Sequence, residues 1–73
     1  GGVHTVPART GNGWWNEVGG KVRSRHRIKE VAVEAGRAIA KRLEVEHTIH
    51  REDGVISAKN SYGNDPFPPR DSR

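Results

Sequence analysis

A chain of 73 residues with thirteen Lys and Arg, nine Asp and Glu and no Cys is expected to form one small basic domain, with neither a disulfide nor a thiolate site. No stretch has the roughly 20 consecutive apolar residues of a membrane-spanning helix, so we expect no membrane span. The segment GGVHTVPA lacks the charged and then apolar pattern of a signal peptide, so a cytoplasmic location is expected.

Three short strands are predicted in the first third of the chain. In residues 3–6 apolar and polar side chains alternate until Pro7, and the TGNG segment that follows favours a turn. Residues 14–18 and 21–25 flank Gly19-Gly20, a pair that suits a two-residue hairpin turn. The second and third strands are therefore predicted to form a β-hairpin.

The predicted hairpin places the two tryptophans on opposite faces. If the turn consists of the two glycines alone, Trp14 faces Arg25 on one side. Trp15 and Val22 then lie on the other side, which we expect to be the side toward the core.

The positive charge is concentrated in residues 21–29, KVRSRHRIK, which hold five Lys and Arg and no acid. The rest of the chain has eight basic against nine acidic residues, so the segment predicts a local anion-binding surface. Alternate residues of a strand share a face, and a basic face with an aromatic side chain is typical of nucleic-acid binding. The predicted nucleic-acid-binding residues are Lys21, Arg23, Arg25, Arg27, Lys29 and Trp14. The alternative is a solvated strand followed by a helix end.

An amphipathic helix is predicted over residues 27–43, because its apolar residues recur at helical spacing. Gly36, in the middle of this helix, costs about 1 kcal/mol relative to Ala. A close approach of the helix to the sheet is the structural reason that we expect for this glycine. The residues of the predicted apolar stripe are Ile28, Val31, Ala32, Ala35, Ile39 and Leu43.

A second hairpin is predicted after the helix, with strands at residues 45–50 and 55–58 and a turn at Asp53-Gly54. The order β-β-β-α-β-β predicts an α+β fold in which one helix covers one face of an antiparallel sheet. This domain is expected to span residues 3–59. The predicted core residues opposite the helix are Trp15, Val22, Ile49 and Ile56.

Residues 60–73 are predicted to form a Pro-rich tail that is partly packed on the domain. The tail contains the only Tyr and Phe of the chain, and proline limits the entropy lost when an extended segment docks. In the alternative interpretation the tail is presented to a protein partner with aromatic grooves. The residues of that partner-binding hypothesis are Tyr62, Asp65, Pro66, Phe67, Pro68 and Pro69.

Five short motifs together resemble a family of small bacterial and phage proteins known only as a domain of unknown function. They are Val3, His4 and Pro7; Gly13 and Trp14; Ser24, Arg25 and His26; Ile49, His50, Arg51, Asp53 and Gly54; and residues 60–69, NSYGNDPFPP. The resemblance covers most of the chain and implies a fold and a lineage, without catalytic or binding residues to carry over. Members of the family usually open the helix with a polar and often acidic segment, whereas this chain is basic there.

Metal and catalytic sites are not expected. His47 and His50 point to opposite faces of a strand, and His4 and His26 are distant in sequence, so no metal site is predicted. The serines lack a nucleophile motif, the carboxylates are scattered, and the glycines do not form a phosphate loop before a helix. We therefore expect neither an enzyme nor a bound cofactor.

The sequence thus predicts a small non-enzymatic binding module. The first interpretation is a protein-interaction or accessory module, with a phage protein as one version of it. The alternative is a nucleic-acid-binding domain that uses the surface of residues 21–29. A third interpretation is a homodimer that forms through an exposed strand edge.

Overall fold

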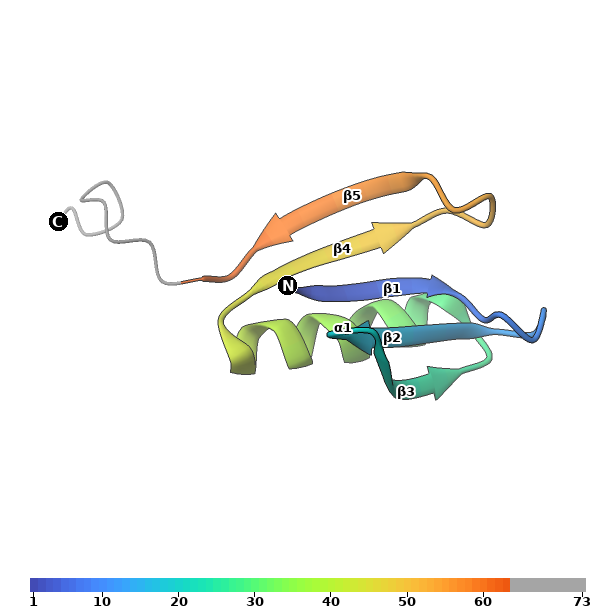
Figure 1. Cartoon of the computed structure of the whole chain (residues 1–73), viewed down its shortest axis with the longest axis horizontal. Helices are drawn as coiled ribbons and strands as arrows, with labels where there is room; N and C mark the ends of the chain where they lie inside the picture. The colour runs from blue at the N-terminus through green and yellow to red at the C-terminus, as the bar shows by residue number, and fades with distance from the viewer. Residues whose placement is uncertain (64–73) are drawn as a thin grey trace, which may run out of the picture.

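The computed structural model describes residues 1–63 and confirms the predicted α+β class and the order of the elements (Figure 1). The elements are β1 (Val3–Pro7), β2 (Trp14–Val18), β3 (Lys21–His26), α1 (Lys29–Leu43), β4 (Glu46–His50) and β5 (Ile56–Ser61). Because β5 extends to Ser61, the predicted domain limit at residue 59 falls inside the last strand.

The five strands form one sheet in the order β3-β2-β1-β4-β5, with α1 on one face (Figure 1). Three neighbouring pairs are antiparallel, as expected, but β1 and β4 are parallel, with Val3 opposite His47. The sheet is therefore mixed, because the chain between these two strands contains a helix that returns it to the end from which β1 starts. Within the described residues α1 packs against β1 to β4 and not against β5.

The register of the β2–β3 hairpin differs from the predicted one. The pairing shifts between Asn16 and Glu17, so that Arg23 has no cross-strand partner. As a result Arg25 lies opposite Trp15, and the predicted pairing of Arg25 with Trp14 is wrong. A β-bulge of this kind inserts one residue and changes which side chains face each other across the hairpin.

The buried stripe of α1 consists of its smallest side chains, Ala32, Gly36 and Ala40. Three residues of the predicted apolar stripe are exposed instead: Ile28, Val31 and Leu43. A Cβ atom on Gly36 would lie 2.5–2.7 Å from side-chain atoms of β1, β2 and β4. The predicted close approach of helix and sheet is thus confirmed, and only small residues fit along it.

Of the predicted core residues, only Ile49 is buried. Trp15 and Val22 are half-buried, and the side of the hairpin toward α1 carries Trp14, which is 8% exposed. Ile56 is 53% exposed, and because it lies opposite His50 in β4 it is on the side of the sheet away from α1.

Tyr62 is half-buried at the end of the described chain. Its backbone N–H donates to the carbonyl of Val45 over 3.3 Å, and the Lys41 Nζ lies 5.6 Å from its ring centroid. The other residues of the partner-binding hypothesis, Asp65, Pro66, Phe67, Pro68 and Pro69, lie outside the described residues. No helix within residues 1–63 has the length and apolar character needed to cross a membrane.

Candidate nucleic-acid interface

The face of the sheet away from α1, called the open face below, is not covered by another element of the described chain. Strand side chains alternate, so Val3, Thr5, Trp14 and Asn16 are buried under the helix while their neighbours point to the other side. The open-face residues of the three central strands are half-buried, apart from the buried Thr48: His4, Val6, Trp15, Glu17, Thr48 and His50.

Two arginines lie against the ring of Trp15 on this face. The Arg25 Cζ is 5.3 Å from the ring centroid, and the Arg9 Cζ, from the loop after β1, is 4.8 Å from it. Arg9 also donates to Glu17 over 2.6 Å, which neutralises part of its charge. Planar guanidinium groups near an indole ring form cation-π contacts, and we call Arg9, Trp15 and Arg25 the Trp15 cluster.

A pocket of about 290 Å³ adjoins the Trp15 cluster. It forms because the β1–β2 loop packs onto the end of β3, where Gly13, with φ of +92°, lies so close that an added Cβ would clash with the carbonyl of His26. No side chain fits at Gly13 in this arrangement. The lining residues are Thr10, Asn12, Trp15, Arg25, His26 and Arg27.

The five cations of residues 21–29 make no ion pair within the described part of the chain. The three arginines and Lys21 are exposed, so their charges remain available to an anionic partner. Lys29 differs because its Nζ lies 5.0 Å from the ring centroid of Trp14, on the helix side of the sheet.

The structure therefore brings together only part of the predicted site. Arg25 and Arg27 line the pocket, Lys21 follows the hairpin turn, Arg23 lies at the bulge, and Trp14 is buried. Arg9 was missed because nothing in a loop sequence indicates which strand residue the loop packs against. Trp15 was assigned to the core because it shares a face of the hairpin with the apolar Val22, but α1 covers the opposite face, which carries Trp14 and Asn16.

A buried polar cluster lies on the other side of the sheet, directly under Gly36. Thr5 Oγ1 donates to Asn16 Oδ1 over 2.5 Å and lies 2.7 Å from His47 Nε2. The hydroxyl has one proton, so His47 Nε2 donates to it, and Nδ1 is an unprotonated acceptor without a partner in residues 1–63. Burial lowers the pKa of His47, and the charges of Arg37 and His4 add to this effect.

All three members of this polar cluster are fully buried, so a ligand cannot reach them without unfolding of the helix contact. Asn16 Nδ2 also donates to the carbonyl of Ala32 over 2.9 Å, which ties the cluster to α1. Buried polar groups that are hydrogen-bonded to one another and to the helix backbone in this way fix the position of the helix on the sheet. The cluster is structural, and the candidate interface is the open face.

A model of the family DUF2188, described as an uncharacterised protein conserved in bacteria, matches residues 3–62. The chain belongs to this family. The DUF2188 match includes all five strands, the helix and the Trp15 cluster, and it ends inside the NSYGNDPFPP run. Searches of curated proteins and of solved structures found no match to the chain.

Proposed function

We propose that this chain is a binding module, without catalytic activity, whose open face binds single-stranded nucleic acid. The observation that carries the proposal is the Trp15 cluster, in which a half-buried indole is flanked by two guanidinium groups on an uncovered sheet. Sheets that bind single strands stack bases on such aromatic side chains and hold phosphates with nearby cations.

A single strand suits this surface better than a duplex does. Stacking on Trp15 requires a base that is free of its neighbours, and the adjacent pocket offers Asn12 and Thr10 as hydrogen-bonding groups. Arg25 and Arg27 line the same pocket and would bind the phosphates of the strand. A duplex is usually read by a helix or ribbon inserted into a groove, whereas the open face is a broad sheet in which the β2–β3 hairpin is held against β1.

The proposal is tested by fluorescence anisotropy with labelled single strands of DNA and RNA and with a duplex, each at two salt concentrations. Trp15→Ala is expected to cost about 1–3 kcal/mol of binding free energy, as for other base-stacking residues. Arg25→Gln is expected to weaken binding and to reduce the salt slope by about 0.7, the contribution of one phosphate contact on a single strand.

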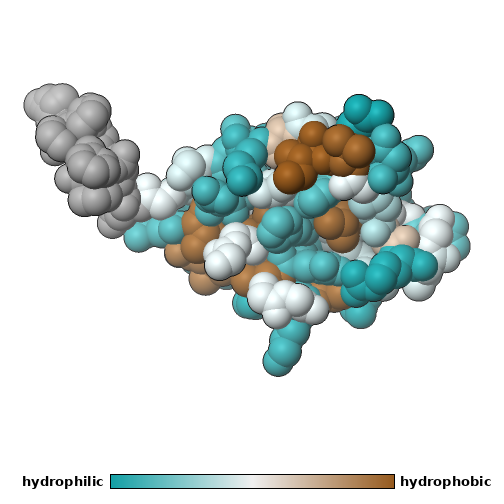
Figure 2. All heavy atoms as spheres, turned by 45° about the horizontal axis from the view of Figure 1, so that its top comes forward, coloured by the Kyte–Doolittle hydropathy of each residue, from teal (hydrophilic) through white to brown (hydrophobic). Residues whose placement is uncertain are grey.

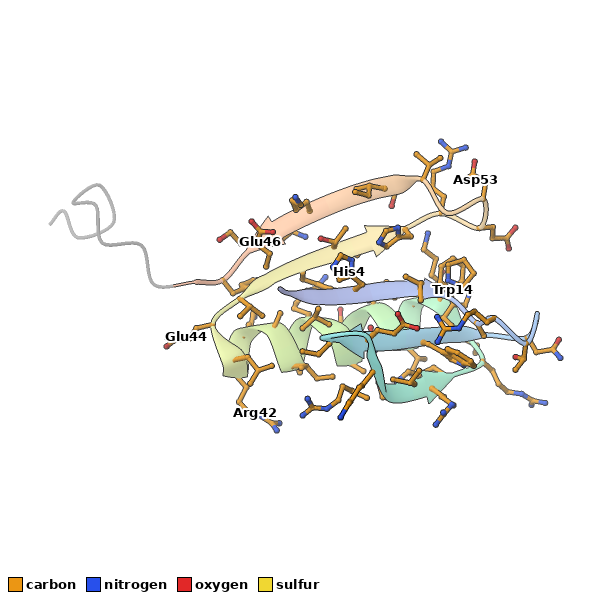
Figure 3. All side chains as sticks on the ribbon, viewed as in Figure 1. His4, Trp14, Arg42, Glu44, Glu46 and Asp53 are labelled. Atoms are coloured by element: carbon orange, nitrogen blue, oxygen red, sulfur yellow. The ribbon has the colours of Figure 1, made fainter. Side chains whose placement is uncertain are left out.

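Arg42→Gln is the matched control, because Arg42 lies near the end of α1, far from Trp14 and the loop side of the sheet (Figure 3). It removes one positive charge from the protein and should change the affinity much less than Arg25→Gln does. An equal loss of affinity in the two variants would mean that binding depends on net charge alone and would contradict the proposal. No binding by the unmodified chain at low salt would refute the proposal.

The second candidate is association with a protein through β5, and a separate observation favours it. Val55 and Ile56 are each 53% exposed, and β5 is an edge strand that α1 does not cover. Figure 2 shows a hydrophobic area at the upper right, toward the end of the sheet that carries the β4–β5 turn. Exposed apolar side chains on an uncovered edge strand are a common basis of strand pairing between chains.

A further inference from the structure

Two histidines that are distant in sequence lie side by side on the open face. His4 is in β1 and His50 in β4, the parallel pair at the centre of the sheet, and Figure 3 shows His4 at this junction. The His4 Nδ1 is 3.2 Å from the His50 Nε2, and the ring centroids are 5.4 Å apart. Both rings are half-buried, so one side of the pair is accessible to solvent.

The hydrogen bonds of His50 fix its tautomer. Its Nδ1 lies 3.0 Å from the carbonyl oxygen of Gly54, which can only accept, so Nδ1 carries the proton. In the neutral ring the Nε2 is then unprotonated, and its lone pair is directed at His4. The space between the two nitrogens therefore holds a single proton, donated by His4 Nδ1.

We propose that this pair is a chelating site for a late first-row divalent metal ion, which binds His4 Nδ1 and His50 Nε2; the proton of His4 Nδ1 moves to its Nε2, so that both rings stay neutral. Metal–nitrogen bonds of about 2.05 Å place two ligand nitrogens about 2.9 Å apart at a right angle and about 3.3 Å apart at a tetrahedral angle. The distance of 3.2 Å between the two nitrogens lies within this interval. In the hydrogen bond the lone pair points along the line between the nitrogens, and chelation requires each ring to turn by about 40° so that its lone pair points at the ion.

The surroundings of the pair have the features of a supported metal site. A ligand histidine usually donates its second ring N–H to a carbonyl or carboxylate, and His50 does so to Gly54. That carbonyl belongs to the β4–β5 turn, and the pairing of β4 with β5 shifts register next to His50. Both ligands are on central strands, which keeps their separation constant.

Two protein ligands leave the other coordination positions to water. No group of three or more His, Cys, Asp or Glu converges anywhere in residues 1–63. Glu17 lies opposite His4 across the β1–β2 pair, but its carboxylate binds Arg9. Imidazole suits Zn²⁺, Ni²⁺ and Cu²⁺, and the Irving–Williams order makes Cu²⁺ the tightest of the three.

The test is isothermal titration of the metal-free chain with Zn²⁺, compared with the variants His4→Gln and His50→Gln. We expect one ion per chain, and a loss of affinity of at least about tenfold in either variant, because one imidazole alone does not chelate. His26→Gln is the matched control, since His26 contacts Ser24 at the end of β3, and it should keep the affinity of the unmodified chain.

Three results would overturn the proposal. The first is the absence of saturable Zn²⁺ binding to the unmodified chain, and the second is equal affinity in both histidine variants. The third is loss of binding in His4→Gln with full binding in His50→Gln, because the ion would then be held by residues 1–4 alone. Thermal unfolding of each variant without metal verifies that the fold is intact, so that lost binding reports lost ligands.

Discussion

At the scale of single residues, Gly36 shows why a glycine, which disfavours helix formation, occupies the middle of α1. The site under it holds Thr5, Asn16 and His47, and an added Cβ would come within 2.5–2.7 Å of an atom of each. The two short hydrogen bonds between these three side chains leave the cluster little freedom to move away. Gly36 therefore sets the distance between α1 and the sheet.

Gly36→Ala is expected to lower the free energy of unfolding by about 1–3 kcal/mol, the usual cost of overpacking a filled interior. At a helix position with free space around it, Gly→Ala would raise the free energy of unfolding by about 1 kcal/mol. The sign of the change therefore tells whether Gly36 is closely packed. Urea unfolding followed by tryptophan fluorescence measures it. Ala38→Gly, at an exposed position of α1, serves as the control and should cost about 1 kcal/mol.

At the scale of elements, the two ends of α1 lack the residues that usually cap a helix. Ile28 occupies the N-cap without a side-chain hydrogen bond, although Ser24 is nearby in sequence. Ser24 instead lies in β3, where its hydroxyl accepts from Asn16 Nδ2. At the other end Glu44 has φ of 58° and ψ of 52°, the left-handed conformation that favours glycine.

Glu44→Gly is expected to raise the free energy of unfolding by about 0.5–1 kcal/mol. The left-handed conformation costs a side-chain-bearing residue roughly 1–2 kcal/mol, and the greater freedom of glycine in the unfolded chain offsets part of the gain. Thermal unfolding measures the change. Glu44→Ala keeps the unfavourable conformation while removing the carboxylate, and a gain equal to that of Glu44→Gly would contradict this explanation.

The existence and order of all six elements could be predicted from the sequence because hydrophobic periodicity and glycine turns are local signals. The bulge beside Arg23 could not, because a hairpin with Gly19-Gly20 at its turn is compatible with both registers. That one-residue shift places Arg25 opposite Trp15 instead of Trp14. The buried stripe of the helix was also predicted at the wrong residues. Periodicity favours the larger apolar residues, whereas the cluster of Thr5, Asn16 and His47 leaves room only for small ones.

At the scale of the whole molecule, the two edges of the sheet differ in their tendency to pair with another copy. The β3 edge carries Lys21, Arg23 and Arg25, and like charges on an edge oppose pairing with another β3. The β5 edge has Lys59 as its only charged residue and has Ile56 exposed. Self-association, if it uses an edge, is therefore expected at β5, where two copies would form one continuous sheet.

Ile56→Lys is expected to abolish this self-association, because a charge on an exposed edge strand opposes pairing. Sedimentation velocity over a range of protein concentrations measures it, with a dimer expected for the unmodified chain and a monomer for the variant. Leu43→Lys replaces another exposed apolar residue, which is 43% exposed at the end of α1, and should leave the dimer unchanged. An unmodified chain that stays monomeric at the highest protein concentrations would contradict the prediction.

Much of the candidate interface depends on contacts that only the complete fold creates. The basic segment 21–29 was visible in the sequence, but Arg9 joins it through a loop, and His4 meets His50 through the parallel pairing of β1 with β4. Parallel pairing across a helix has no signature in the local sequence. The sequence therefore indicated which surface is charged, and the topology determined which side chains meet on it.

The central position of β1 also determines the order in which the sheet can assemble during synthesis. β1 is made before the other described strands and can pair with β2 as soon as β2 is made, but its other edge stays open until β4, which begins at Glu46, has been made. At roughly 5–20 residues per second this takes about 2–8 seconds. During that time the nascent chain has an unpaired edge at the centre of its future sheet, which a chaperone or a neighbouring nascent chain could reach.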